Sequence, residues 1–441
     1  MQTPVKITRI KSLKGSCSLP VDQLSFQCAL AAAVLARGES ALSGDAPGGY
    51  TEHFVTCLRR LGATAEYACD KGPTFVNGRG AAALQEGINA LEAPLECGGS
   101  ELTVNLLAGI VAGTGGEAVL VGDDYLNQQK FGRLADALRR LGAQVELSEE
   151  GTLPLIIKGG GLCGTEIASS VPDPALKAAV LLAGMQATGV TRFTEPARSA
   201  DHIERILGQC GATLQKKVSG GGRGEYSVEI TPCDELQAAA FDLPGDFSRA
   251  LYLVTAALLL PGSDLTITEV GLNPSRREGV KILQRMGGRI ELENRRTVGG
   301  EVRGDIHVRR SKMKGVGISR GTAALIQEDI PPIVMAGALA EGETYFKDVS
   351  VLREKGTDRI AALVANLKAL GLEVGESPDG LIYRGRQTLD DAVFDSFGDP
   401  LVGLACHVCA LTCHGESEIR NYDVARRYWP GFTGLIESLT A

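Results

Sequence analysis

One helix-and-strand pattern recurs six times along the chain and constrains its fold more than any other feature. In each copy a run rich in Ala, Leu and Val reaches a glycine and continues into a short strand-like stretch, as in "LVTAALLLPGSDLTIT". By subtraction the equivalent glycines are 78, 73, 73, 80 and 73 residues apart, at Gly38, Gly116, Gly189, Gly262, Gly342 and Gly415. These periods are far longer than those of solenoid repeats, so each copy is predicted to be an α/β module of its own.

A second helix follows the first and is again stopped by glycine before a strand, as in "LRRLGATAEY", "LRRLGAQVEL" and "LQRMGGRIEL". Glycine directly after a last helical turn is the expected left-handed cap. The first helix of each module is apolar nearly all round, which predicts that it is buried. The second helix has one polar face, so we expect it to lie outside.

Three modules in each half predict two compact domains, residues 20–241 and residues 1–19 plus 242–441. The six buried helices start at loops rich in Pro, Gly and acidic residues, such as "LPVDQLS", "SVPDPAL" and "QEDIPPI". If equivalent ends of the modules face the same way, the positive ends of six helix dipoles converge on a cleft between the domains. Such a cleft suits anionic substrates.

Composition narrows the classes of partner. The chain has 441 residues, a net charge of −8 and 44% hydrophobic residues, which is typical of a globular protein without runs of Lys and Arg for nucleic acid. Its apolar runs are too short and too often bounded by Pro or Gly to span a bilayer, and its 11 cysteines favour a reducing compartment. We expect a cytoplasmic monomer that binds a small molecule, with no nucleic-acid or membrane partner.

Two long segments resemble the enolpyruvyl transferases, and among them the enolpyruvylshikimate-phosphate synthases. They are "LPGDFSRALYLVTAALLLPGSDLTITEVGLNPSRREGVKILQRMGG" and "LREKGTDRIAALVANLKALGLEV", and the likeness extends over nearly the whole chain. The resemblance implies a two-domain inside-out α/β barrel of six α/β units, with the N-terminal strand packed in the C-terminal domain. It implies transfer of the enolpyruvyl group of phosphoenolpyruvate to a hydroxyl, by addition and then elimination of phosphate, without a metal or an organic cofactor.

The same resemblance assigns roles to the C-terminal half. Lys355 and Arg359 match the proton-handling lysine and the phosphoenolpyruvate-binding arginine of the family, and Glu328 with Asp329 replaces its Asp-Glu pair. We therefore expect Lys355, Glu328 and Asp329 to be catalytic. The segment "VSVLREKGTDRIAALVANLKALG", Val349 to Gly371, is predicted to begin a helix that holds Arg353 close to Lys355 and Arg359, with Thr357 as a possible cap.

The N-terminal half departs from the family pattern. Gln23 and Cys28 stand where the family has lysine and arginine, and Gln129 replaces a further arginine beside Lys130. Asp173 stands in place of a serine near the sugar phosphate. A charge-assisted contact contributes roughly 1.5 to 3 kcal/mol, so losing several together should weaken binding of the usual phosphorylated substrates by many orders of magnitude. The expected substrate-binding residues are Arg359, Arg353, Gln23, Lys130, Asp173 and Arg427.

Three functions remain open. The first is an enzyme of specialised metabolism that acts by proton transfer, in enolpyruvyl transfer or elimination, on a small cyclic hydroxylated substrate. The second is a non-catalytic homologue that binds a small molecule or a partner, and the third is a weakened 3-phosphoshikimate 1-carboxyvinyltransferase. The stretch "CHVCALTCH" suggests a metal, but its cysteines lie in an apolar run, where free cysteine is a small core residue, and no metal site is predicted.

Overall fold

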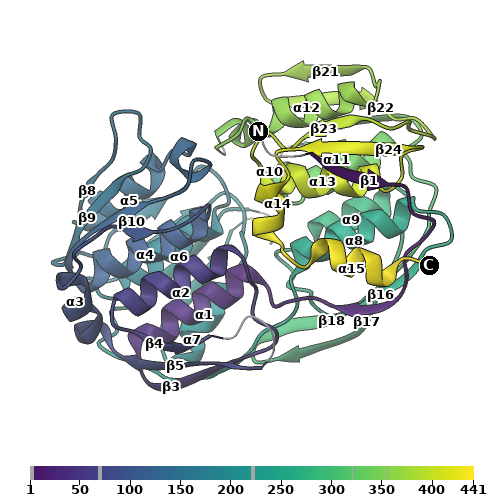
Figure 1. Cartoon of the computed structure of the whole chain (residues 1–441). Coiled ribbons are helices and arrows are strands. Elements are labelled where there is room, and N and C mark those ends of the chain that lie inside the picture. The colour runs from purple at the N-terminus through teal and green to yellow at the C-terminus, as the bar shows by residue number, and fades with distance from the viewer. Residues whose placement is uncertain (1–3, 68–71, 220–223, 320, 355) are drawn as a thin grey trace. The chain divides into compact units, whose positions relative to one another are not determined.

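The computed structural model describes residues 4–67, 72–219, 224–319, 321–354 and 356–441 (Figure 1). Backbone contacts divide the chain into two compact units. The N-terminal unit consists of Pro20–Pro244 and Val298–Glu301, and the C-terminal unit of Met1–Leu19, Gly245–Thr297 and Val302–Ala441.

The N-terminal unit is built around three buried helices, α1 (Gln23–Leu35), α4 (Glu101–Thr114) and α6 (Pro174–Gly184). The amphipathic helices α2 (Tyr50–Arg60), α5 (Gly132–Leu141) and α7 (His202–Gln209) each follow one of them in the chain. The unit also contains α3 (Ala81–Asn89) and the 3-10 turn η1 (Leu126–Gln128).

Three small sheets complete this unit, and their order repeats. In each sheet, a strand from the end of one module pairs in parallel with the first strand of another module. That first strand also pairs, antiparallel, with one strand of a hairpin. The sheets are β6 (Leu95–Glu96), β7 (Gly116–Val121), β9 (Leu155–Gly159), β8 (Gln144–Glu146); β10 (Glu166–Ala168), β11 (Thr191–Glu195), β13 (Tyr226–Ile230), β12 (Leu214–Val218); and β14 (Leu236–Gln237), β3 (Ala36–Ser43), β5 (Thr74–Arg79), β4 (Thr64–Glu66). Strands β14 and β15 (Ala240–Asp242) end the third module and pair with β3 of the first, which closes the unit.

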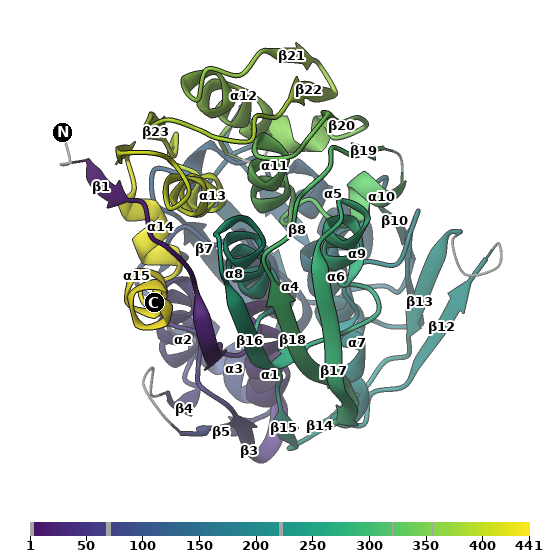
Figure 2. The same cartoon turned by 90° about the vertical axis from the view of Figure 1, so that its right-hand side faces the viewer.

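The C-terminal unit repeats this plan with the buried helices α8 (Phe247–Leu259), α11 (Ile330–Ala338) and α13 (Pro400–Ala410). Its other helices are α9 (Glu278–Arg285), α10 (Gly321–Leu325), η3 (Ser350–Glu354), α12 (Arg359–Ala369), α14 (Asp423–Tyr428) and α15 (Phe432–Leu439). Its sheets are β17 (Arg289–Val298), β18 (Glu301–Arg309), β16 (Asp264–Gly271), β2 (Lys14–Ser18); β19 (Gly317–Ile318), β20 (Glu343–Phe346), β22 (Gly380–Arg384), β21 (Val374–Ser377); and β1 (Val5–Thr8), β24 (Glu416–Arg420), β23 (Val393–Asp395). The N-terminal strands β2 and β1 pair with β16 and β24, as Figure 2 shows.

The mixed α/β fold and its six modules are therefore confirmed. The glycines that stop the second helices all have positive φ, as predicted for left-handed caps, at Gly62, Gly142, Gly211, Gly287 and Gly371. One local prediction is wrong: Arg353 lies in η3, and α12 begins only at Arg359. The N-cap is Asp358, whose side chain accepts a hydrogen bond from the Ala361 N–H at 2.9 Å, and Gly356 with φ 65° precedes it. None of the described helices is both long and apolar enough to cross a membrane.

Close contact between α4 and α6 generates a test of the packing. A Cβ added at Gly109 would lie 2.6 Å from the Ala179 carbonyl oxygen. Because that atom is backbone, we expect Gly109→Ala to lower the free energy of unfolding by about 2 kcal/mol, measured by urea denaturation. The matched control is Gly208→Ala in α7, where a Cβ would meet nothing within 4 Å. It should leave stability unchanged or raise it by up to about 1 kcal/mol, and an equal loss in both variants would contradict this packing.

Candidate active site

The starts of the six buried helices are equivalent positions, and five of them are capped in the same way. In each of these five a side-chain oxygen accepts a hydrogen bond from a backbone N–H of the first turn. The capping residues are Asp22 in α1, Ser100 in α4, Asp173 in α6, Asp246 in α8 and Asp399 in α13. These side chains therefore satisfy helix donors that an anionic ligand could otherwise bind.

The sixth helix, α11, differs because of two prolines. Asp329 is its N-cap residue, but the Asp329 side chain makes no capping hydrogen bond. A capping side chain accepts from the second or third N–H of a helix, and in α11 those positions are Pro331 and Pro332, which have none. The sequence thus places a carboxyl group at a helix start and removes the donors that would hold it there.

Asp329 instead turns to neighbours within the C-terminal unit. Its Oδ1 accepts a hydrogen bond from the Ser248 Oγ at 3.0 Å, and Arg276 Nη2 donates to that Oγ at 2.5 Å. The guanidinium of Arg276 also lies 3.7 Å from Glu328 Oε2. Asp329, Ser248, Arg276 and Glu328 come from two modules and form a compact polar cluster, which we call the Asp329 cluster.

Burial gives Asp329 an unusual proton affinity. The residue is 5% exposed, and loss of hydration raises the pKa of its carboxyl to about 7. The nearby negative charges of Glu328 and Asp246 raise this pKa further, whereas Arg276 and the Ser248 hydrogen bond oppose the rise. A carboxyl group with a pKa near 7 can both accept and release a proton at neutral pH, which is the requirement for a general acid or base. The adjacent Glu328 side chain is 60% exposed, so the two carboxyl groups have contrasting environments.

Two of the predicted cations of the C-terminal unit, Arg359 and Arg353, are paired with carboxylates. Arg359 begins α12, and its Nε lies 2.7 Å from Asp399 Oδ2 in a buried ion pair. Arg353 lies 2.6 Å from Asp358 and 3.0 Å from Glu376. Arg427 is exposed on α14, and Lys355 lies outside the described residues.

The predicted residues of the N-terminal unit lie on three different elements. Gln23 is the first residue of α1 and is partly exposed. Lys130 is exposed between η1 and α5, and Asp173 caps α6 while its carboxylate lies 3.6 Å from Arg133.

Sequence reasoning missed a buried network that fixes this helix start. Lys177 in α6 is fully buried and lies 3.1 Å from Glu195 and 2.9 Å from Glu204. Although burial lowers the pKa of Lys177, the charges of Glu204 and Glu195 raise it overall. Glu195 Oε2 also accepts the backbone N–H of Asp173 at 3.1 Å. A lysine within an apolar helix was the available signal, because such a charge needs buried partners.

Ser248 and Arg276 were also missed as site residues. They are 28 positions apart, and Ser248 is 81 positions from Asp329, so no local pattern joins them. The signal for Asp329 was available in the sequence, because "EDIPPI" removes the capping donors while the other helix starts keep them. The cysteines of "CHVCALTCH" are free and lie in the core, at Cys406, Cys409 and Cys413.

The raised pKa of Asp329 predicts a specific pH dependence of stability. Between about pH 4 and pH 7 the unfolded chain releases this proton while the folded protein keeps it, so its contribution to stability is lost as pH rises. The difference between a pKa of about 4 in the unfolded chain and about 7 in the folded protein corresponds to roughly 4 kcal/mol in the free energy of unfolding. Asp329→Asn should remove this decrease in the free energy of unfolding, measured by urea denaturation between about pH 4 and pH 7. Glu437→Gln, which removes an exposed carboxylate from α15, should retain it, and an unchanged slope in Asp329→Asn would contradict the prediction.

Comparison of the sequence and fold with known proteins shows the family of this chain. The model of EPSP synthase (3-phosphoshikimate 1-carboxyvinyltransferase) matches residues 7–436. Proteins named 3-phosphoshikimate 1-carboxyvinyltransferase are 33% identical in Brevibacillus brevis, over 99% of this chain and 100% of the relative, and 35% identical in Synechococcus sp. (strain JA-3-3Ab), over 97% and 95%. An EPSP synthase structure from Acinetobacter baumannii matches with a TM-score of 0.82 and 27% identity, over 99% of this chain and 98% of that chain. The enolpyruvyl transferase NikO from Streptomyces tendae, 18% identical with a TM-score of 0.75, shares the fold. By its sequence along nearly its whole length and by its fold, this chain belongs to the EPSP synthase family of enolpyruvyl transferases.

Proposed function

We propose that this enzyme acts by proton transfer on a small cyclic hydroxylated substrate that carries less negative charge than 3-phosphoshikimate. Asp329 is the central acid and base, with Glu328 and Lys355 as further proton carriers. The observation that carries the proposal is the Asp329 carboxyl, which is buried, has a pKa near 7 and is held by Ser248 instead of capping its helix.

Two reactions fit such a group. In enolpyruvyl transfer a substrate hydroxyl adds to C2 of phosphoenolpyruvate while C3 gains a proton, and the adduct then loses that proton as phosphate leaves. In elimination a base removes a proton from a ring carbon, and an acid protonates the departing hydroxyl, which leaves as water. Each needs a group that accepts a proton in one step and returns it in the next, which a pKa near 7 allows. Neither reaction needs a metal or an organic cofactor.

Charge matching within the chain supports the less anionic substrate. Arg359 is already paired with Asp399, and Arg353 with Asp358 and Glu376. At the position of a family arginine, Cys28 is fully buried, and burial together with the nearby charge of Asp22 raises the pKa of its thiol, so it stays uncharged. We propose that Arg359, Arg353, Gln23, Lys130, Asp173 and Arg427 contact the substrate as polar groups in a cleft between the domains 20–241 and 1–19 plus 242–441.

The comparisons favour a second candidate, a weakened 3-phosphoshikimate 1-carboxyvinyltransferase, because relatives with that name are 33–35% identical over nearly the whole chain. A third candidate is a non-catalytic binding homologue, for which the internally paired arginines are the supporting feature. We also propose that the protein is cytoplasmic, since its described cysteines are free thiols, and that it acts as a monomer.

Calorimetry separates the first two candidates. Neither shikimate 3-phosphate nor phosphoenolpyruvate, alone or together, should bind below about 1 mM, because the contacts that would neutralise their charge are replaced or already paired. Unphosphorylated cyclic hydroxy acids, followed by proton NMR with and without phosphoenolpyruvate, should include a substrate. Sub-millimolar binding of shikimate 3-phosphate, with release of phosphate when phosphoenolpyruvate is added, would favour 3-phosphoshikimate 1-carboxyvinyltransferase activity over our proposal.

Substitution of Asp329 separates an enzyme from a binding protein. With the substrate found by that screen, Asp329→Asn should lower kcat by roughly 10²- to 10⁴-fold without loss of folding, because a neutral amide neither takes up nor releases a proton near pH 7. Glu437→Gln, which removes an exposed carboxylate from α15, should stay within about threefold of the parent, a change of well under 1.4 kcal/mol in the barrier. Lys355→Met should also abolish turnover at an unchanged melting temperature. Full turnover by Asp329→Asn would refute the mechanism, and ligand binding without any turnover in the parent protein would favour the non-catalytic homologue.

A further inference from the structure

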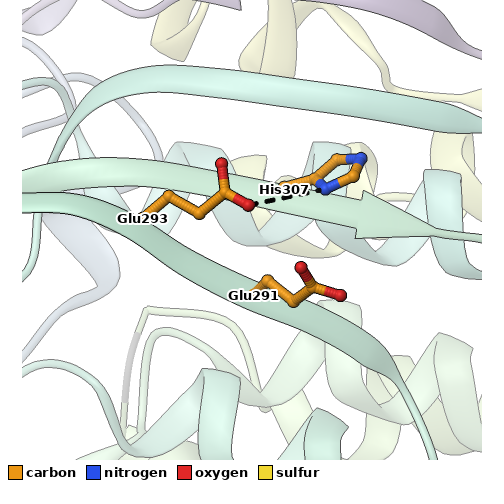
Figure 3. Close-up of side chains that lie close together, drawn as sticks. All are labelled: Glu291, Glu293 and His307. Carbon is orange, nitrogen blue, oxygen red and sulfur yellow. Dashed lines mark ion pairs between the residues drawn. The ribbon is translucent and has the colours of Figure 1, made fainter.

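Three side chains with metal-binding atoms meet on the outer face of the sheet formed by β17, β18, β16 and β2. Glu291 and Glu293 come from β17 and His307 from β18 (Figure 3). One possible ligand atom from each lies within 4.8 Å of the other two. None of these residues belongs to the Asp329 cluster or to the sites implied by the family resemblance.

The strand period explains why these residues share a face. Residues two apart on a strand point the same way, so Glu291 and Glu293 both face outward while the intervening Leu292 packs against the core. His307 is part of β18, which lies between β17 and β16 in the sheet. The site thus rests on regular backbone rather than on a loop.

A carboxylate on a third strand orients the imidazole. Asp264 in β16 lies with its Oδ1 2.7 Å from His307 Nε2. With the ring proton on Nε2, this contact leaves the Nδ1 lone pair facing Glu293 Oε1 at 3.9 Å, the pair marked in Figure 3. A lone pair and a carboxylate oxygen repel each other unless a cation lies between them. A carboxylate behind a histidine that binds metal through its other nitrogen is the usual arrangement at zinc sites.

The carboxylates around His307 outnumber the arginine that pairs with them, which favours binding of a cation. Glu291, Glu293 and Asp264 are carboxylates, and Arg309 pairs with one of them, its Nη2 lying 2.6 Å from Glu291 Oε1. Arg309 therefore neutralises at most one of the three carboxylates. Because both glutamates are exposed, their side chains can rotate to shorten the distance between ligand atoms at little cost in packing.

We propose that Glu291, Glu293 and His307 bind one divalent ion of the Zn²⁺ class, with Asp264 as the positioning residue and water in the remaining position. One imidazole nitrogen with two carboxylates matches the ligand preference of Zn²⁺, whereas Mg²⁺ and Ca²⁺ prefer oxygen ligands alone. The ion joins β17, the edge strand of the sheet, to β18, so its binding stabilises the fold by mass action. This site is independent of the proposed reaction.

The test is calorimetric titration of the full chain with Zn²⁺ near pH 7.5, after accessible thiols are blocked with iodoacetamide. We expect one ion per chain, and Glu293→Gln, His307→Gln and Asp264→Asn should each weaken binding by about tenfold or more. Glu418→Gln, which removes a partly exposed carboxylate from β24 of the same unit, is the matched control and should bind as the parent does.

A second readout covers variants that fold poorly. Zn²⁺ should raise the melting temperature of the parent and of Glu418→Gln, while Glu291→Gln and His307→Gln should show a clearly smaller rise. Three results would overturn the proposal: no binding below about 1 mM, binding unaffected by His307→Gln, or Mg²⁺ binding as tightly as Zn²⁺. Any of these would mean that Glu291, Glu293 and His307 are surface polar groups that do not form a metal site.

Discussion

Two missing backbone N–H groups distinguish the start of α11 from the starts of the other five buried helices. A carboxyl group at a helix start is normally held by donors of the first turn, which favour its charged form. Pro331 and Pro332 remove those donors from α11, and packing buries Asp329 at the same place. Its carboxyl keeps its proton to a pKa near 7 because hydration is lost and no helix donor compensates. Ser248 and Arg276 then fix its orientation without fully restoring the charged state.

At the other five helix starts the first-turn N–H donors are present and hold a capping side chain. Their donors are satisfied by carboxylates or a hydroxyl of the chain itself, and Arg359 is satisfied by the capping residue Asp399. An anion arriving at these positions would displace an existing contact rather than fill a vacant one. Under the proposed function, these internal contacts lower the substrate charge that the protein tolerates, while the fold is that of the family.

Much of the fold could be predicted from the sequence because its signals are local and repeated. Apolar helix faces, glycine caps and a period near 75 residues specify the modules without knowledge of long-range contacts. The site was only partly predictable. Asp329 could be named from a motif, but its contact with Ser248 depends on the packing of α8 against α11, which no short pattern encodes. Arg353 was assigned to a helix that Gly356 and the cap Asp358 in fact delay until Arg359.

The partners of charged residues were the least predictable feature. In the sequence Lys177 is a single cation within an apolar helix. In the structure it forms buried ion pairs with Glu195 of the following strand and Glu204 of the following helix. The family resemblance assigns Arg359 to a ligand-binding position, yet Arg359 is paired with Asp399 within the chain. Residue type can be carried over from a resemblance, whereas charge balance depends on every neighbour in the folded chain.

A carbon-13 NMR titration of the Asp329 carboxyl tests the central claim most directly. In the parent protein the midpoint should lie near pH 7. Pro332→Ala restores an N–H in the first turn of α11, so the Asp329 side chain can accept it and the midpoint should fall toward the usual value of about 4. A midpoint near 4 in the parent, or no change in Pro332→Ala, would contradict the claim that the missing helix donors make Asp329 an acid–base group.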